Sequence, residues 1–147
     1  MKNNIVGREL EIRKLNDVFN SDKSEFVAIY GRRRVGKTFL VREMFADKFT
    51  FEISGIANAK TKSQLLNFTL TMNQTFDRQL PPAVNWLTAF AQLSDLVSKS
   101  PAKRKVLFFD EIPWIDTPRS EFLELLGFGA KRHCFDCLRL GYFVDYQ

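Results

Sequence analysis

Eight consecutive residues in the first third of the chain combine two glycines, a lysine and a threonine at a spacing that suits phosphate binding. Residues 31–38 read GRRRVGKT and match the pattern G-x-x-x-x-G-K-[ST]. The glycines let the backbone turn tightly, so that peptide N–H groups can point at phosphate oxygens. Lys37 can reach the β- and γ-phosphates, and the Thr38 hydroxyl can ligate Mg²⁺. The segment therefore predicts a site for a purine nucleoside triphosphate, with Mg-ATP as the expected ligand.

The residues predicted to bind the nucleotide cover the whole loop and one residue beyond it. They are Gly31, Arg32, Arg33, Arg34, Val35, Gly36, Lys37, Thr38 and Phe39. With average residue frequencies, the pattern arises by chance in roughly one chain of this length in two hundred. The alternative interpretation is a glycine-bounded surface turn. The run Arg32–Arg34 receives no catalytic role, because these side chains can simply decorate the outside of the loop.

A second candidate site lies where an apolar run meets two carboxylates. Residues 106–111 read VLFFDE, which is typical of a buried strand that ends in acidic side chains. Ligands gather at the carboxyl ends of parallel strands, so Asp110 is expected beside the phosphate loop, where it can hold Mg²⁺ directly or through water. Glu111 can orient and deprotonate an attacking water. The catalytic candidates are thus Glu111 and Lys37, and a solvated strand end is the other interpretation of the two acids.

Alternating strands and helices are predicted around these residues. The expected strands are 26–30, 49–53 and 106–109, and the expected helices are 8–20, 38–48, 60–78, 85–99 and 118–128. Continuous apolar runs such as FVAIY and VLFF are typical of strands buried on both faces. The pattern indicates an α/β fold with a parallel sheet that helices cover on both faces.

The composition fits one globular domain with a modest positive charge. The chain has 147 residues, of which 45% are hydrophobic and 15 are Phe, so it can bury a core and is not of the disordered class. The net charge of +5 suits a polyphosphate or nucleic-acid ligand, and it equally suits an ordinary solvated surface.

Neither a membrane segment nor a metal-binding cysteine cluster is predicted. No apolar run of the sequence approaches the roughly 20 residues that span a bilayer, and the N-terminus MKNNIVGREL lacks the apolar core of a signal peptide. A cytoplasmic location without a membrane partner is therefore expected. Cys134 and Cys137 form a single C-x-x-C after His133, which lacks the second ligand pair of a zinc site and implies no disulfide framework.

Three segments together resemble a known family. VGRE at 6–9, GRRRVGKT at 31–38 and VLFFDEIPWIDTPRSEFL at 106–123 are similar to the archaeal-type ATPases, which belong to the signal-transducing P-loop ATPases related to the AAA+ group. SGIAN, QLLNF and NWLTAF, which begin at residues 54, 64 and 85, resemble intermediate segments of that family. The resemblance extends over about residues 3–128.

The resemblance implies a three-layer α/β P-loop NTPase fold with an ATPase site. Lys37 and Thr38 would bind the phosphates, Thr38 and Asp110 would be the magnesium ligands, and Glu111 would be the hydrolytic carboxylate. The residues that it places near the adenine are Val6, Gly7 and Arg8. Read from the residues alone, this segment is explained equally well as the start of a helix.

The chain departs from the family pattern after residue 128. Family members continue into further strands, a helical lid and a C-terminal domain that contacts DNA or partner proteins, and their next strand inserts between the phosphate-loop strand and the Asp-Glu strand. Residues 1–128 are therefore expected to form a partial ATPase domain, incomplete at the C-terminus, and residues 129–147 an aberrant tail, with out-of-frame translation as a hypothesis. Residues 138–146 can still pair as a substitute strand, because several of them favour β structure.

Three functions stay open from the sequence. The first is Mg-dependent ATP hydrolysis, which drives a conformational switch, and the second is nucleotide binding by a fragment without hydrolytic activity. The third is phosphate-directed binding of nucleic acid through Arg32–Arg34 and Lys103–Lys105. The sequence specifies neither the oligomeric state nor the physiological partner.

Overall fold

A computed structural model describes residues 8–32, 37–127 and 137–145. Along the chain its elements are α1 (Glu9–Phe19), β1 (Glu25–Arg32), α2 (Lys37–Phe45), β2 (Phe49–Ser54), α3 (Thr61–Phe76), α4 (Trp86–Ser98), β3 (Val106–Asp110), α5 (Ile112–Ile115), α6 (Phe122–Leu126) and β4 (Leu138–Asp145). The strands form one sheet in the order β1-β4-β3-β2, and all neighbouring pairs are parallel. The predicted α/β fold with a parallel sheet is confirmed.

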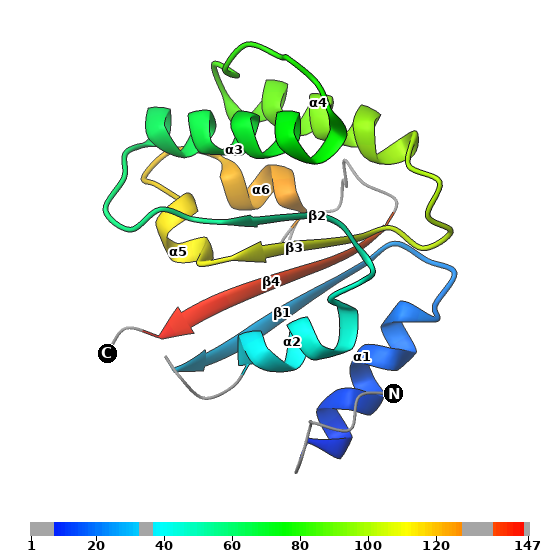
Figure 1. Ribbon diagram of the computed structural model, residues 1–147. Helices are drawn as coiled ribbons and strands as arrows, with labels where there is room; N and C mark the ends of the chain where they lie inside the picture. The colour runs from blue at the N-terminus through cyan, green and yellow to red at the C-terminus, as the bar shows by residue number, and fades with distance from the viewer. Residues whose placement is uncertain (1–7, 33–36, 128–136, 146–147) are drawn as a thin grey trace.

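Helices cover both faces of this sheet and give the molecule three layers. Figure 1 shows α1 and α2 on one face and α3, α4 and α6 on the other. Two separate hydrophobic clusters fill the spaces between the layers, one beneath α1 and α2 and one beneath α3, α4 and α6. The three-layer arrangement therefore matches the expected NTPase architecture.

The apolar character of β3 follows from its position inside the sheet. Val106 and Phe108 belong to the cluster beneath α1 and α2, whereas Leu107 and Phe109 belong to the opposite cluster. All four side chains are fully buried. Because side chains alternate between the faces of a strand, a strand covered on both faces must be apolar throughout. The run ends at Asp110, where the strand leaves the core.

The last strand, β4, lies at the position where the family pattern has a strand between the phosphate-loop strand and the Asp-Glu strand. β4 pairs with β1 over its whole length and with β3 through residues 138–141, so it lies between these two strands. Leu138 and Leu140 are fully buried against the α1 and α2 face. The prediction of a substitute strand at 138–146 is thus confirmed, and the sheet has no gap between β1 and β3.

One buried charge accompanies this strand. Arg139 is fully buried on the other face of β4, where its Nη1 donates to the carbonyl oxygen of Leu126 at 3.1 Å and its Nη2 donates to Ser24 Oγ at 3.3 Å. Its guanidinium also lies 5.6 Å from the centroid of the Phe26 ring. These contacts connect β4 with α6 and with the start of β1.

The predicted helix at 118–128 is wrong in its extent. The structure has a helical turn, α5, that was not predicted, and the later helix α6 begins only at Phe122. Arg119 and Glu121 have φ angles of 62° and 64°, which are left-handed and cannot belong to a right-handed helix. The other predicted helices and strands are present with bounds shifted by at most three residues.

The described residues offer neither a membrane span nor a metal cluster of the zinc type. Within the described ranges, no helix has both the length and the apolar character needed to cross a membrane. The same ranges contain no group of three or more His, Cys, Asp and Glu that could hold a metal. Cys137 is buried, while His133 and Cys134 lie outside the described residues, as does most of the predicted tail before β4.

Candidate functional site

The predicted phosphate loop connects β1, an edge strand of the sheet, to a helix. β1 ends at Arg32 and α2 begins at Lys37, so the motif has the strand–loop–helix context that phosphate binding requires. The N-terminus of α2, with its partial positive charge, follows the loop directly. Residues 33–36 lie outside the described residues, and for Gly31, Arg32, Lys37 and Thr38 only the backbone is described. The roles of the individual loop residues stay predictions.

Asp110 lies at the same edge of the sheet as this loop. β1 and β3 both run parallel to β4, so their carboxyl ends lie at the same end of the sheet (Figure 1). Asp110 Oδ1 accepts a hydrogen bond from the backbone N–H of Glu111 at 2.9 Å, and only 13% of the side chain is exposed. Burial raises the pKa of the Asp110 carboxyl above its ordinary value, and the hydrogen bond from Glu111 offsets part of this rise.

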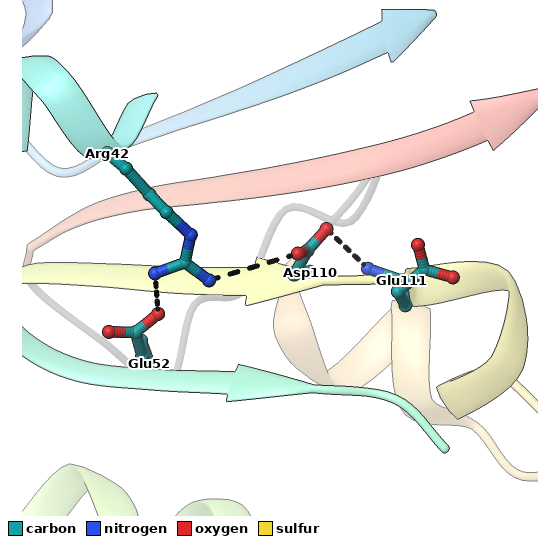
Figure 2. Close-up of polar contacts among 4 residues, drawn as sticks. All are labelled: Arg42, Glu52, Asp110 and Glu111. Carbon is teal, nitrogen blue, oxygen red and sulfur yellow. Dashed lines mark hydrogen bonds and ion pairs between the residues drawn. The ribbon is translucent and has the colours of Figure 1, made fainter. Parts of the chain in front are cut away.

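Two residues that the sequence did not single out surround this carboxylate. Arg42, on the second turn of α2, forms an ion pair with Glu52 of β2 at 2.5 Å between Nη1 and Oε2. Its Nη2 lies 4.0 Å from Asp110 Oδ2, and its guanidinium lies 5.5 Å from the centroid of the Phe108 ring. Figure 2 shows Arg42 reaching from α2 toward both carboxylates. The one sequence signal was the spacing of four residues between Thr38 and Arg42, which places both on one face of α2.

Glu111 has an unusual backbone conformation just after the strand. Its φ and ψ angles are 57° and 41°, in the left-handed region that residues other than glycine rarely adopt. It precedes α5 directly, and its carboxylate lies beside the Arg42–Glu52–Asp110 group (Figure 2). Backbone strain of this kind occurs preferentially at functional sites.

Gly55 fixes the backbone next to these two acids. Its N–H donates to the carbonyl oxygen of Asp110 at 3.0 Å. A Cβ atom at Gly55 would lie 2.6 Å from the carbonyl oxygen of Glu111 and 2.7 Å from Ile115 Cγ1, which is closer than real contacts allow. The segment after β2 therefore needs glycine here, because it passes directly against the turn that carries Glu111.

A buried amide holds the neighbouring loops together. Gln64 of α3 is only 2% exposed, and its Oε1 accepts a hydrogen bond from the N–H of Ile56. Its Nε2 donates to three carbonyl oxygens, those of Ile56 at 2.7 Å, Ala59 at 3.3 Å and Trp114 at 3.0 Å. Asn67 donates to the carbonyl oxygen of Ser54 at 3.1 Å. The segments SGIAN, QLLNF and DEIPW, which are far apart in the sequence, thus meet at the edge where Asp110 lies.

The remaining predicted site residues are only partly described. Phe39, on the first turn of α2, has 52% of its surface exposed. Arg8 directly precedes α1 and forms an ion pair with Glu11 at 3.5 Å. Val6 and Gly7 lie outside the described residues, so the prediction that this segment contacts adenine is not tested.

A glycine-containing segment joins β1 to α2, and an Asp-Glu pair stands at the end of β3 in a parallel sheet with helices on both faces. This is the arrangement of a P-loop NTPase domain. Comparison with known families agrees, since residues 4–131 match the AAA ATPase domain family. The chain belongs to this family, whose members bind and hydrolyse ATP.

Two relatives from the archaeon Methanocaldococcus jannaschii match shorter segments. One is an uncharacterized ATP-binding protein, 40% identical over 43 residues, which are 29% of this chain and 73% of that protein. The other is an uncharacterized protein, 54% identical over 35 residues, which are 24% of this chain and only 8% of that protein. The resemblance to archaeal ATPases that the motifs indicated is confirmed.

The chemistry of Asp110 fits a magnesium ion bound together with a nucleotide. Mg²⁺ in nucleotide sites takes one or two carboxylates and fills its other positions with phosphate oxygens and water. A single carboxylate at the end of β3, near the first turn of α2 where Thr38 lies, can supply the protein's share of such a site.

Replacing Asp110 by Asn should stabilise the nucleotide-free protein near neutral pH. The pKa of this carboxyl is raised on folding, so ionisation costs folding free energy that the neutral amide does not. The advantage should shrink as the pH falls through the raised pKa and vanish below the pKa of a free aspartate. Thermal unfolding in Mg-free buffer across this pH range measures the difference, with Asp95→Asn at an exposed position on α4 as the control. A variant that is less stable than the wild type at neutral pH would contradict the assignment.

Proposed function

We propose that this chain binds Mg-ATP on the loop between β1 and α2 and hydrolyses it. The observation that carries the proposal is the Asp110–Glu111 pair at the carboxyl end of β3, on the edge of the sheet where β1 leads into α2. Lys37 binds the β- and γ-phosphates, and Thr38 and Asp110 are the protein's ligands to the Mg²⁺ ion. The ion, when bound, neutralises charge that develops on the phosphates.

Glu111 is the residue that activates the attacking water in this proposal. It follows the metal carboxylate by one residue, and its left-handed backbone turns the chain away from the strand direction at this point. The contact with Gly55 holds that turn in place. A carboxylate fixed beside the phosphate site can orient a water and accept its proton.

Nucleotide binding without turnover is the alternative at the same site. It needs the phosphate loop and Asp110 but makes no demand on Glu111. The hydrolytic proposal is therefore distinguished from the alternative at this one residue, and phosphate release by the wild-type protein decides between them.

Two substitutions should separate binding from hydrolysis. Lys37→Ala should lower the affinity for Mg-ATP by on the order of 100-fold, because it removes a charged hydrogen-bond donor from the phosphates. Glu111→Gln should keep that affinity within a few-fold and lower the rate of phosphate release by about 100-fold or more. Calorimetry and a phosphate-release assay measure the two effects, with Lys14→Ala at an exposed position on α1 as control.

Each outcome bears on a different residue. Unchanged ATP affinity in Lys37→Ala would refute the phosphate-loop assignment, and unchanged turnover in Glu111→Gln would remove Glu111 from the mechanism. A wild-type protein that binds Mg-ATP and releases no phosphate would establish the binding-only alternative.

A basic cleft at the opposite edge of the sheet favours a second candidate function. The cleft has a volume of about 1410 Å³ and lies between the end of α1, the start of β2 and the turn before β3. Its basic lining residues are Lys48, Arg78, Lys99, Lys103 and Arg104, against the acids Asp22 and Asp47. Phe19, Phe49 and Phe76 also line it. Positive charge combined with aromatic surface is the chemistry that binds single-stranded nucleic acid.

This cleft accommodates only one of the two basic segments in the nucleic-acid hypothesis. Lys103 and Arg104 line it, whereas Arg32 ends β1 at the other edge of the sheet. Arg104 is held by the carbonyl oxygens of Val18 and Lys23, at 2.7 and 2.9 Å, so it also anchors the turn to α1. The phosphate loop and the cleft therefore constitute two separable sites.

Charge reversal in the cleft tests the second candidate. The double variant Lys99→Glu/Lys103→Glu should weaken binding of a fluorescent oligothymidine by about tenfold or more at low salt and reduce the salt dependence. Fluorescence anisotropy measures both quantities. Lys60→Glu/Lys62→Glu, which makes the same charge change beside α3 at the other edge, should have a smaller effect. A flat salt response, or equal losses in both double variants, would contradict the assignment.

A further inference from the structure

The guanidinium of Arg42 lies between two carboxylates and is much closer to one of them. Its Nη1 is 2.5 Å from Glu52 Oε2, whereas its Nη2 is 4.0 Å from Asp110 Oδ2 (Figure 2). We propose that Glu52 is a positioning residue, which holds Arg42 away from Asp110 and so keeps that carboxylate available to the Mg²⁺ of bound ATP. The inference rests on the proposed function, because it concerns the same site.

If Glu52 were absent, the guanidinium of Arg42 would move toward Asp110 and form an ion pair with it. The base of its side chain is fixed on α2, and its guanidinium lies over Phe108, two residues before Asp110 on the same strand. A guanidinium has five N–H donors in a fork that matches a carboxylate. The Asp110 side chain is 13% exposed and that of Glu52 is 42% exposed, so solvent screens an ion pair with Asp110 less.

A closed Arg42–Asp110 pair would oppose magnesium binding for two reasons. Asp110 Oδ1 already accepts the N–H of Glu111, so Oδ2 is the oxygen for which the guanidinium and a cation would compete. The charges of Arg42, Glu52 and Asp110 also add to −1, and without the Glu52 charge they add to zero. Both effects lower the attraction of the site for a divalent cation.

The role of Glu52 can be tested by substitution because this residue contributes little to the free energy of folding. It is on β2, the edge strand farthest from β1, and its ion pair with Arg42 is nearly half exposed on both sides. Exposed pairs of this kind add little to stability. The neutral variant Glu52→Gln is therefore expected to fold, and its effect on the site can be measured.

The test compares ATP affinity with and without Mg²⁺ in a double-mutant cycle. In Glu52→Gln, the gain in ATP affinity that Mg²⁺ provides should fall by about tenfold, while the affinity in the presence of a chelator stays within about twofold. The double variant Arg42→Gln/Glu52→Gln should recover most of the lost gain, since the competing guanidinium is gone. Calorimetry on these proteins and on Arg42→Gln, each with Mg²⁺ and with a chelator, gives every affinity of the cycle without any need for turnover.

The control is Asp95→Asn, which removes one negative charge from an exposed residue of α4 and should leave the gain unchanged. The inference fails if Glu52→Gln keeps the full magnesium gain, or if the double variant does not recover it. Such a result in a protein that still binds Mg-ATP at Lys37 would leave the proposed function standing. Loss of ATP binding in the wild type itself would overturn both.

Discussion

The parallel direction of all four strands is the constraint on which the rest of this structure depends. Parallel strands need helical crossovers, so both faces of the sheet are covered and the strands between them are apolar. They also bring all carboxyl ends to one edge, where the backbone groups of β1 and β3 are no longer paired within the sheet. Polar groups that can bind a ligand therefore collect at that edge. The end of β1, the start of α2 and the acids at the end of β3 lie there for this reason.

The edge is built as one connected unit of polar contacts. Asp110 is largely buried, which raises its pKa, and a backbone N–H and a guanidinium lie around it. Gly55 allows the chain after β2 to pass against Glu111, and Gln64 joins the same loop to α3 and α5. The loops after β2 and β3 are therefore held together at the end of the sheet where Asp110 lies.

Local patterns predicted those parts of the fold that depend on local properties. The run VLFF identified β3 because burial on both faces demands apolar residues at consecutive positions. The glycine-lysine motif predicted a strand followed by a helix, and β1 and α2 flank it. The helix at 118–128 was overestimated, because Arg119 and Glu121 adopt left-handed angles that their residue types do not favour and that interrupt a right-handed helix. The pairing of Arg42 with Glu52 could not be predicted, because it joins α2 to β2 through space. The place of β4 between β1 and β3 likewise depends on the whole sheet, although its β-forming residues indicated a strand.

The central claim is that the backbone between β1 and α2 holds a triphosphate whose magnesium ion is shared with the end of β3. A crystal structure with Mg²⁺ and a non-hydrolysable ATP analogue tests it most directly. We expect the phosphates against residues 31–38 and the ion bonded to Thr38 at about 2.1 Å, with Asp110 as a direct ligand or one water away. A triphosphate bound in the cleft at the opposite edge, or an ion remote from Asp110, would contradict the claim.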